Sequence, residues 1–166
     1  MARSAAEVRR TTGLVVAVLL LVVLVVAGTH FHNAAAAAAA KDESDRRAVA
    51  VARQAALGLT NISAQTVEQD TQRLAALATG AFADQFAQQT TAFRDIVTGS
   101  QVTSRGEVVE AALSHSDGRT AVALAAVRAT VGNAAAPEGQ QRQYRLRITL
   151  EKTAETWLVA NLEFVP

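Results

Sequence analysis

The sequence contains no cysteine, and this absence removes several functional classes at once. Without a thiol, the chain has no disulfide framework, no thiolate metal site and no cysteine nucleophile. Proline and aromatic residues are scarce as well: there are two Pro, five Phe, one Tyr and one Trp among 166 residues. A hydrophobic core must therefore be built mainly from Ala, Val and Leu, with the aromatic residues as its few bulky parts.

The sequence also lacks a concentration of positive charge. The basic residues are arginine apart from Lys41 and Lys152, and beyond residue 40 the chain carries 13 basic and 14 acidic residues. A domain that binds nucleic acid normally presents a concentrated basic surface. The near-neutral balance therefore predicts no nucleic-acid partner.

One long apolar run is present near the N-terminus. Thr11–Thr29 contains no charged residue, and Leu14–Ala27 consists only of Leu, Val and Ala. A helix needs about 20 apolar residues, and at least roughly 17, to cross a bilayer. Arg3, Arg9 and Arg10 precede the run, so the positive-inside rule keeps the N-terminus in the cytoplasm. We expect a cytoplasmic segment 1–10, a transmembrane helix 11–29 and an exported remainder, that is, a single-pass protein of a bacterial cell membrane.

A cleaved secretory signal peptide is the alternative, because the tract Ala34–Ala40 could supply a cleavage site. The apolar run is at the long end for a signal peptide, and His30–Asn33 intervenes before the alanines. We therefore favour retention of the helix. Since alanine loses no side-chain entropy in a helix, residues 30–40 are predicted to form an alanine-rich helical linker.

Residues 41–98 are predicted to form three helices. In 41–60, apolar residues recur at spacings of three and four, which gives one narrow stripe made of Val49, Ala52, Ala56 and Leu59. A second helix starts near Thr66, where Thr66 and Gln69 match the capping-box pattern, and ends near Gly80, which tolerates a positive φ. A third helix carries Phe82, Phe86, Phe93 and Val97 on one side and stops at Gly99-Ser100.

Residues 101–165 are predicted to form four antiparallel strands. From Tyr144 to Glu151 apolar and polar residues alternate, as in a half-buried strand. Ser116–Arg119 is a hairpin turn between a strand ending near Ser114 and one starting near Thr120. Gly132–Gly139 is expected to be a longer loop, and Glu155-Thr156 a turn before the last strand, Trp157–Val165. Helices followed by strands predict an α+β domain over 41–166.

Two short motifs carry a resemblance to a known family: Ala78–Phe86, which contains Thr-Gly-Ala-Phe, and the ending Trp157–Glu163. With the anchor and the order of elements, the chain resembles the actinobacterial Mce-associated membrane proteins over roughly residues 10–166. This resemblance implies a cone-like domain similar to nuclear transport factor 2, with a curved antiparallel sheet wrapped around helices. It also implies an accessory role beside an Mce-type lipid importer, and it transfers no catalytic residue.

Candidates for catalysis are few. Among the histidines, His30 and His32 fall at the membrane exit and lack a third ligand, and His115 lies beside a turn. Asp84 is turned away from the Phe82–Phe86 side by helical geometry, whereas Asp70 could face inward as a buried acid or pair with Arg73 or Arg94. No Ser-His-Asp set, glycine-rich phosphate loop or carboxylate pair is visible. We expect no catalytic residue, no metal, no cofactor and no identifiable small-molecule substrate.

One basic cluster stands out, made of Arg142, Arg145 and Arg147. Arg145 and Arg147 share one face of the predicted strand, so they could form cross-strand charge pairs on a solvated sheet face. They could also contact a partner protein or anionic lipid headgroups. We take the cluster as the candidate partner contact.

The sequence thus predicts a non-enzymatic accessory subunit of an envelope complex, most specifically an Mce-type lipid importer with transporter subunits as partners. A subunit of another envelope machine, such as a secretion system, is the first alternative. A membrane-tethered cone-fold enzyme or lipid-binding module is the second.

Overall fold

The computed structural model describes residues 36–154 and 156–166. The chain divides into two compact units, Met1–Asp42 and Glu43–Pro166. In the first unit residues 36–42 are helical and exposed, and residues 30–35 of the predicted linker 30–40 lie outside the described residues. The predicted transmembrane segment 11–29 lies outside the described residues. Within the described ranges, no helix is long and apolar enough to span a bilayer.

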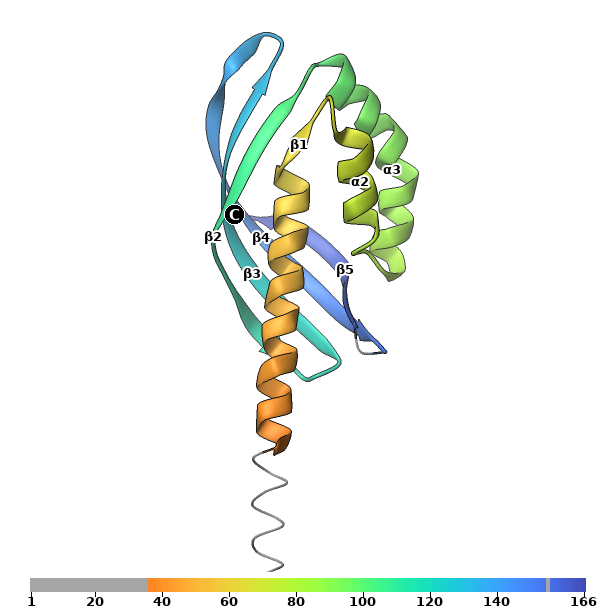
Figure 1. Ribbon diagram of the computed structural model, residues 1–166, viewed down its shortest axis with the longest axis vertical. Helices are drawn as coiled ribbons and strands as arrows, with labels where there is room; N and C mark the ends of the chain where they lie inside the picture. The colour runs from red at the N-terminus through yellow and green to blue at the C-terminus, as the bar shows by residue number, and fades with distance from the viewer. Residues whose placement is uncertain (1–35, 155) are drawn as a thin grey trace, which may run out of the picture. The chain divides into compact units, whose positions relative to one another are not determined.

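The second unit is a curled five-stranded antiparallel sheet with helices on its concave side (Figure 1). The strands follow in chain order: β1 (Ile62–Ser63), β2 (Thr103–Ser116), β3 (Thr120–Asn133), β4 (Ala136–Thr153) and β5 (Thr156–Val165). Residues 43–60 are helical and are followed after β1 by α2 (Val67–Ala75) and α3 (Gly80–Gly99). The predicted α+β class is confirmed, and so are three helices followed by four long antiparallel strands, although β1 lies between the first helix and α2.

The number of strands differs from the prediction because β1 was not foreseen. It is two residues long, and it pairs with the start of β2 through Ile62 opposite Ser104 and Ser63 opposite Thr103. A segment of two residues is too short to show the alternation of apolar and polar residues that indicates a strand. It is extended because its partner strand offers hydrogen bonds there.

The predicted loop Gly132–Gly139 is also wrong, because β4 already begins at Ala136. Asn133 lies opposite Ala136, and its side-chain Oδ1 accepts hydrogen bonds from the N–H groups of Ala135 (3.0 Å) and Ala136 (2.9 Å). The asparagine side chain thereby closes a tight turn. The strands β3 and β4 continue past the point where proline and glycine had indicated a loop.

Alanine builds most of the contact between the first helix and the sheet. Ala48, Ala52, Ala55 and Ala56 are completely buried. They share one core cluster with the concave-face residues of β3 and β4, which are Ala121, Ala123, Ala125, Val127, Leu146, Ile148 and Leu150. Because alanine is small, the helix backbone comes close to the sheet. The larger side chains that fill the space between helix and sheet therefore come from the strands. The predicted stripe is confirmed, although Val49 and Leu59 lie at its half-buried margins.

The end of this helix is fastened to β2 by an asparagine. Asn61 Nδ2 donates to the carbonyl oxygen of Gly106 (3.0 Å), and Asn61 Oδ1 accepts from the N–H of Gly106 (3.1 Å). Ser104 Oγ donates to the carbonyl oxygen of Thr60 (2.7 Å). A Cβ on Gly106 would lie 2.3 Å from Thr60 Oγ1, so only glycine allows this approach.

The helices α2 and α3 depart from the prediction in two ways. The capping box does not form: Thr66 precedes α2 without a side-chain capping bond, and its hydroxyl donates to Asp70 Oδ2 (2.7 Å) instead. The phenylalanines expected on one side of the third helix also divide between two core clusters. Phe82 and Phe86 are half-buried against the main cluster, whereas Phe93 packs with Ile62, Val67 and Val97 in a second one. Val97 is the only fully buried residue of α3.

The predicted Thr-Gly-Phe segment is confirmed in part. Gly80 has a φ of +55°, and the rings of Phe82 and Phe86 lie 6.0 Å apart. However, α2 already ends at Ala75, and Gly80 is the first residue of α3 rather than the end of α2. The segment also forms backbone hydrogen bonds to the last strand. The N–H of Thr79 donates to the carbonyl oxygen of Val159 (2.8 Å), and the N–H of Val159 donates to the carbonyl oxygen of Leu77 (2.7 Å). The corner between α2 and α3 is thereby attached to β5.

Trp157 is buried, as its place in the last strand predicted, with 2% of its surface exposed. Its Nε1–H donates to Ser44 Oγ at 3.2 Å. Since Ser44 lies in the first helix, the indole connects that helix to β5. A buried indole keeps a polar partner in this way.

Candidate functional site

The convex face of the sheet carries two of the three arginines of the predicted contact cluster. Directly opposite residues of an antiparallel pair lie on the same face. Arg145 lies opposite Ala126 and Arg147 opposite Leu124, both on the exposed side of β3. Arg147 forms an ion pair with Glu163 across the strands (3.0 Å), as expected for a solvated face. Within the described residues, Arg145 has no ion pair or hydrogen bond of its side chain.

Arg142 does not lie with the other two. Its register partner is Ala129, which is 1% exposed and belongs to the concave side. The Arg142 guanidinium donates to Gln140 Oε1 (2.8 Å), near the end of the sheet. An odd spacing in a strand puts residues on opposite faces, so the cluster seen in the sequence divides in space.

Apolar side chains lie beside Arg145 on the convex face. Val109 and Leu124 are 54% and 45% exposed. Val109 is at a register shift between β2 and β3, which turns an extra side chain toward solvent. A shallow groove of about 580 Å³ borders it, lined by Val109, Ala126, Arg128, Gln143, Arg145 and Val165, among others. The combination of exposed apolar residues and an unpaired arginine is typical of a protein contact.

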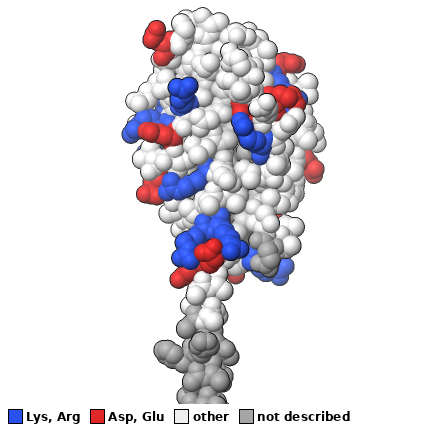
Figure 2. Space-filling model, viewed as in Figure 1, with Lys and Arg blue, Asp and Glu red and all other residues white. Residues whose placement is uncertain are grey.

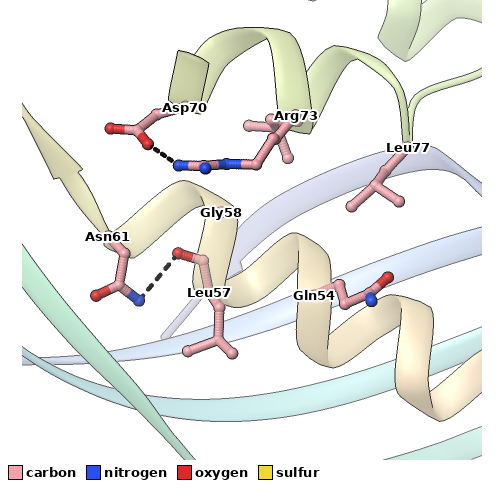
Figure 3. A pocket seen from close by; sticks show the side chains of 8 residues that line it. Gln54, Leu57, Gly58, Asn61, Asp70, Arg73 and Leu77 are labelled. Carbon is pink, nitrogen blue, oxygen red and sulfur yellow. Dashed lines mark hydrogen bonds and ion pairs between the residues drawn. The ribbon is translucent and has the colours of Figure 1, made fainter. Parts of the chain in front are cut away.

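A second candidate is a cavity of about 400 Å³ between the first helix and α2 (Figure 3). Eight residues line it: Gln54, Leu57, Gly58, Asn61, Asp70, Arg73, Leu74 and Leu77. Figure 3 shows the Arg73 side chain extending toward Asp70, with a dashed line between the two. No motif in the sequence indicated this site. Its one readable signal was a glycine inside an otherwise strong helix-forming stretch.

Asp70 is buried at the edge of this cavity, with 4% of its surface exposed. The carboxylate pairs with Arg73, and it accepts hydrogen bonds from Thr66 Oγ1 (2.7 Å) and, at 3.4 Å, from the N–H of Ser63. Both predicted alternatives thus hold, since Asp70 is buried and also paired with Arg73. Arg94 pairs with Glu68 instead, at 2.6 Å. The hydrogen bonds from Ser63 and Thr66 to Asp70 hold the turn between β1 and α2.

The remaining predicted candidates are scattered. His115 and Asp84 are exposed, and His30 and His32 lie outside the described residues. No group of three metal-ligating side chains occurs in the ranges 36–154 and 156–166. On the face drawn in Figure 2, basic and acidic side chains are interspersed rather than gathered by sign.

The comparison with known families gives one match across nearly the whole chain. A family model described as "Uncharacterized protein Rv1363c/MT1408-like" matches residues 10–166. The chain belongs to this family. The protein Rv1363c of Mycobacterium tuberculosis is 29% identical over 127 residues, which cover 75% of this chain and 49% of that protein. The chain therefore spans about half the length of this curated relative.

Solved structures share the fold at low sequence identity. The periplasmic domain of DotI has a TM-score of 0.59 and 15% identity, over 71% of this chain and 92% of that one. CagV of Helicobacter pylori, a VirB8 homologue, has a TM-score of 0.55 and 7% identity, over 70% and 95%. TraE, solved with 2-(2-furyl)isonicotinic acid, has a TM-score of 0.55 and 14% identity, over 70% and 92%. Together with the curled sheet around its helices, these likenesses establish the predicted cone-like fold.

Proposed function

We propose that this protein is a non-enzymatic accessory subunit of a cell-envelope complex, held by a single N-terminal membrane helix with its cone domain outside the cytoplasm. The observation that carries this proposal is the convex sheet face, where Arg145 has no side-chain partner among the described residues and lies beside the exposed Val109 and Leu124. A partner protein with an acidic and apolar surface complements this face. Anchoring raises the effective concentration of the domain toward a membrane-embedded partner, so even a weak contact becomes occupied.

The fold supports an envelope machine as the setting. DotI contributes a periplasmic domain of this fold, and CagV is described as a VirB8 homologue of a type IV secretion system. The resemblance of the Ala78–Phe86 and Trp157–Glu163 motifs favours an Mce-type lipid importer over a secretion system. A secretion system is the second candidate, because CagV is described as a homologue of one of its subunits.

The state of Asp70 supports a non-enzymatic role. A general acid or base needs a carboxyl group that can reach the substrate and exchange a proton with it. The Asp70 carboxylate is occupied by Arg73, Thr66 and Ser63, which hold the local fold. It is the only charged side chain that is buried in the described part of the chain. We therefore expect Asp70→Asn to act on stability rather than on a chemical step.

The docking face is tested with two arginines of the same strand. The tagged full-length chain is cross-linked in native membranes, purified and analysed by mass spectrometry, as the original protein and as Arg145→Glu and Arg142→Glu. Charge reversal on the convex face is expected to lower capture of the partner about tenfold. Arg142→Glu changes charge equally but lies on the concave register, so it is the matched control.

The identity of the captured proteins decides among the candidates. Mce transporter subunits support the importer, and subunits of a secretion apparatus support the alternative. Equal loss of capture in both variants would contradict docking through the convex face. Capture of no envelope complex at all, from cells that express the protein at its normal level, would contradict the accessory role.

A further inference from the structure

Gly58 is placed where a helix would ordinarily carry a larger residue. It lies within the helical stretch that runs to residue 60, and its φ is not in the left-handed region. A Cβ built on it would meet only Leu74, at an ordinary contact distance of 3.5 Å from Cδ1. Glycine in a helix interior destabilises the fold relative to alanine. Neither sterics nor backbone conformation requires this glycine, so its occurrence calls for another reason.

Gly58 lines two cavities. The larger, of about 400 Å³, is lined by Gly58 together with Leu57, Leu74 and Leu77. The smaller, of about 180 Å³, lies toward α3 and shares Gly58, Asp70 and Leu74 with the larger one. Known ligand sites begin at about 300 Å³ and combine an apolar lining with a few placed polar groups. The larger cavity meets both criteria.

The lining indicates the chemistry of a ligand. Its apolar part consists of leucine side chains and contains no aromatic ring, which suits an aliphatic chain better than a stacked ring system. Its polar part includes Arg73, whose side chain is 69% exposed although one nitrogen is bound to Asp70. A guanidinium has five N–H donors, so the pair with Asp70 leaves donors for an anionic group.

We propose that this cavity binds a single aliphatic chain with an anionic headgroup, the chain against Leu57, Leu74 and Leu77 and the headgroup on Arg73. Gly58 keeps the space open at a cost in helix stability. Asp70 orients the guanidinium and also repels a headgroup that comes too close, so the anion contacts the exposed side of Arg73. A free fatty acid and a lysophospholipid share this chemistry. Binding here is independent of docking through the convex face, which involves other residues.

The test uses the full-length chain in lipid nanodiscs and a fatty acid that carries a photoreactive diazirine in its chain. After irradiation, the labelled peptides are identified by mass spectrometry. We expect saturable labelling on the segments 54–61 and 70–77. Unlabelled dodecanoate or lysophosphatidylglycerol should compete, and dodecyltrimethylammonium, with the opposite charge, should not. The stronger of the two anionic competitors identifies the source of the headgroup.

Gly58→Ala separates binding from folding. The added methyl group should raise the thermal midpoint by a few degrees and lower the labelling yield about fivefold. Gly99→Ala is the matched control, because this helical glycine also has free space around it but borders neither cavity, so labelling should be unchanged. Arg73→Gln should abolish the preference for anionic competitors. Labelling that is confined to other segments, or unchanged in Gly58→Ala, would overturn the proposal.

Discussion

Gly106 is the residue at which the first helix and β2 come closest. A methyl group there would lie 2.3 Å from Thr60 Oγ1 and 2.6 Å from Thr60 Cβ. Thr60 cannot move freely, since its hydroxyl donates to the carbonyl oxygen of Ala56 (2.7 Å) and its own carbonyl accepts from Ser104. We expect Gly106→Ala to lower the free energy of unfolding by about 1–3 kcal/mol, measured by urea denaturation.

The control for this substitution is Gly99→Ala, at which no atom lies within 4 Å of the added methyl group. It should leave stability unchanged or raise it slightly. Equal destabilisation by both substitutions would show that backbone freedom, and not the contact with Thr60, determines the effect.

Asp117 provides a pH-dependent prediction at the same scale. Its carboxylate accepts hydrogen bonds from the backbone N–H groups of Thr120 (2.6 Å) and Arg119 (2.8 Å) and from the Thr120 hydroxyl (2.9 Å). These hydrogen bonds lower the pKa of Asp117 from 3.8 to about 2, and the bond from the Thr120 backbone N–H has the largest effect. Because the folded pKa is below the unfolded one, the turn's stabilisation is complete above about pH 4. It is lost as the pH falls toward 2.

A carboxyl carbon NMR titration of Asp117 measures this directly. The inflection should fall near pH 2, and the stability difference between the original chain and Asp117→Ala should narrow between pH 4 and pH 2. An inflection near pH 4 would show that the hydrogen bonds of the turn are not maintained in solution.

At the scale of elements, the alanine contact between the first helix and the sheet limits side-chain size. Ala52 is completely buried in the main core cluster, while Ala50, two residues earlier on the same helix, is exposed. We expect Ala52→Leu to cost about 1–3 kcal/mol, because the extra carbons must push the helix away from the strands.

The matched variant Ala50→Leu should stay within about 0.5 kcal/mol of the original chain. Both variants are compared by urea denaturation. If Ala52→Leu were tolerated as well as Ala50→Leu, the helix would not pack on the sheet in the register described.

At the scale of the whole molecule, the proposed membrane topology can be tested with one introduced thiol. The chain has no cysteine, and Ala135 is exposed in the turn between β3 and β4. A membrane-impermeant maleimide should label Ala135→Cys in intact cells, on a chain of full length, since the segment 11–29 is expected to be retained and the domain to be outside.

Two other results would change the conclusion. A labelled chain in the medium, shortened by about thirty-five to forty residues, would indicate cleavage and a secreted module. Labelling only after lysis would place the domain in the cytoplasm. A mock-labelled original chain, which has no thiol, is the background control.

The sequence determined what depends on local pattern. The helix over 41–60, the hairpin turn at Asp117-Gly118, the positive φ of Gly80 and the alternation from Tyr144 to Glu151 follow from periodicity and from residues with particular backbone preferences. These signals are carried by a few neighbouring residues, so they can be read before the chain is folded.

The tertiary structure decided what depends on distant partners. Alanine is favoured in any helix, so its sequence pattern did not show that Ala48 and Ala55 would be core residues; the facing strands made them so. Ile62 and Ser63 became a strand only because β2 was available, and Asp70 became a structural carboxylate because folding placed Arg73, Thr66 and Ser63 around it. The separation of Arg142 from Arg145, and the cavity beside Gly58, likewise arise from strand register and helix packing.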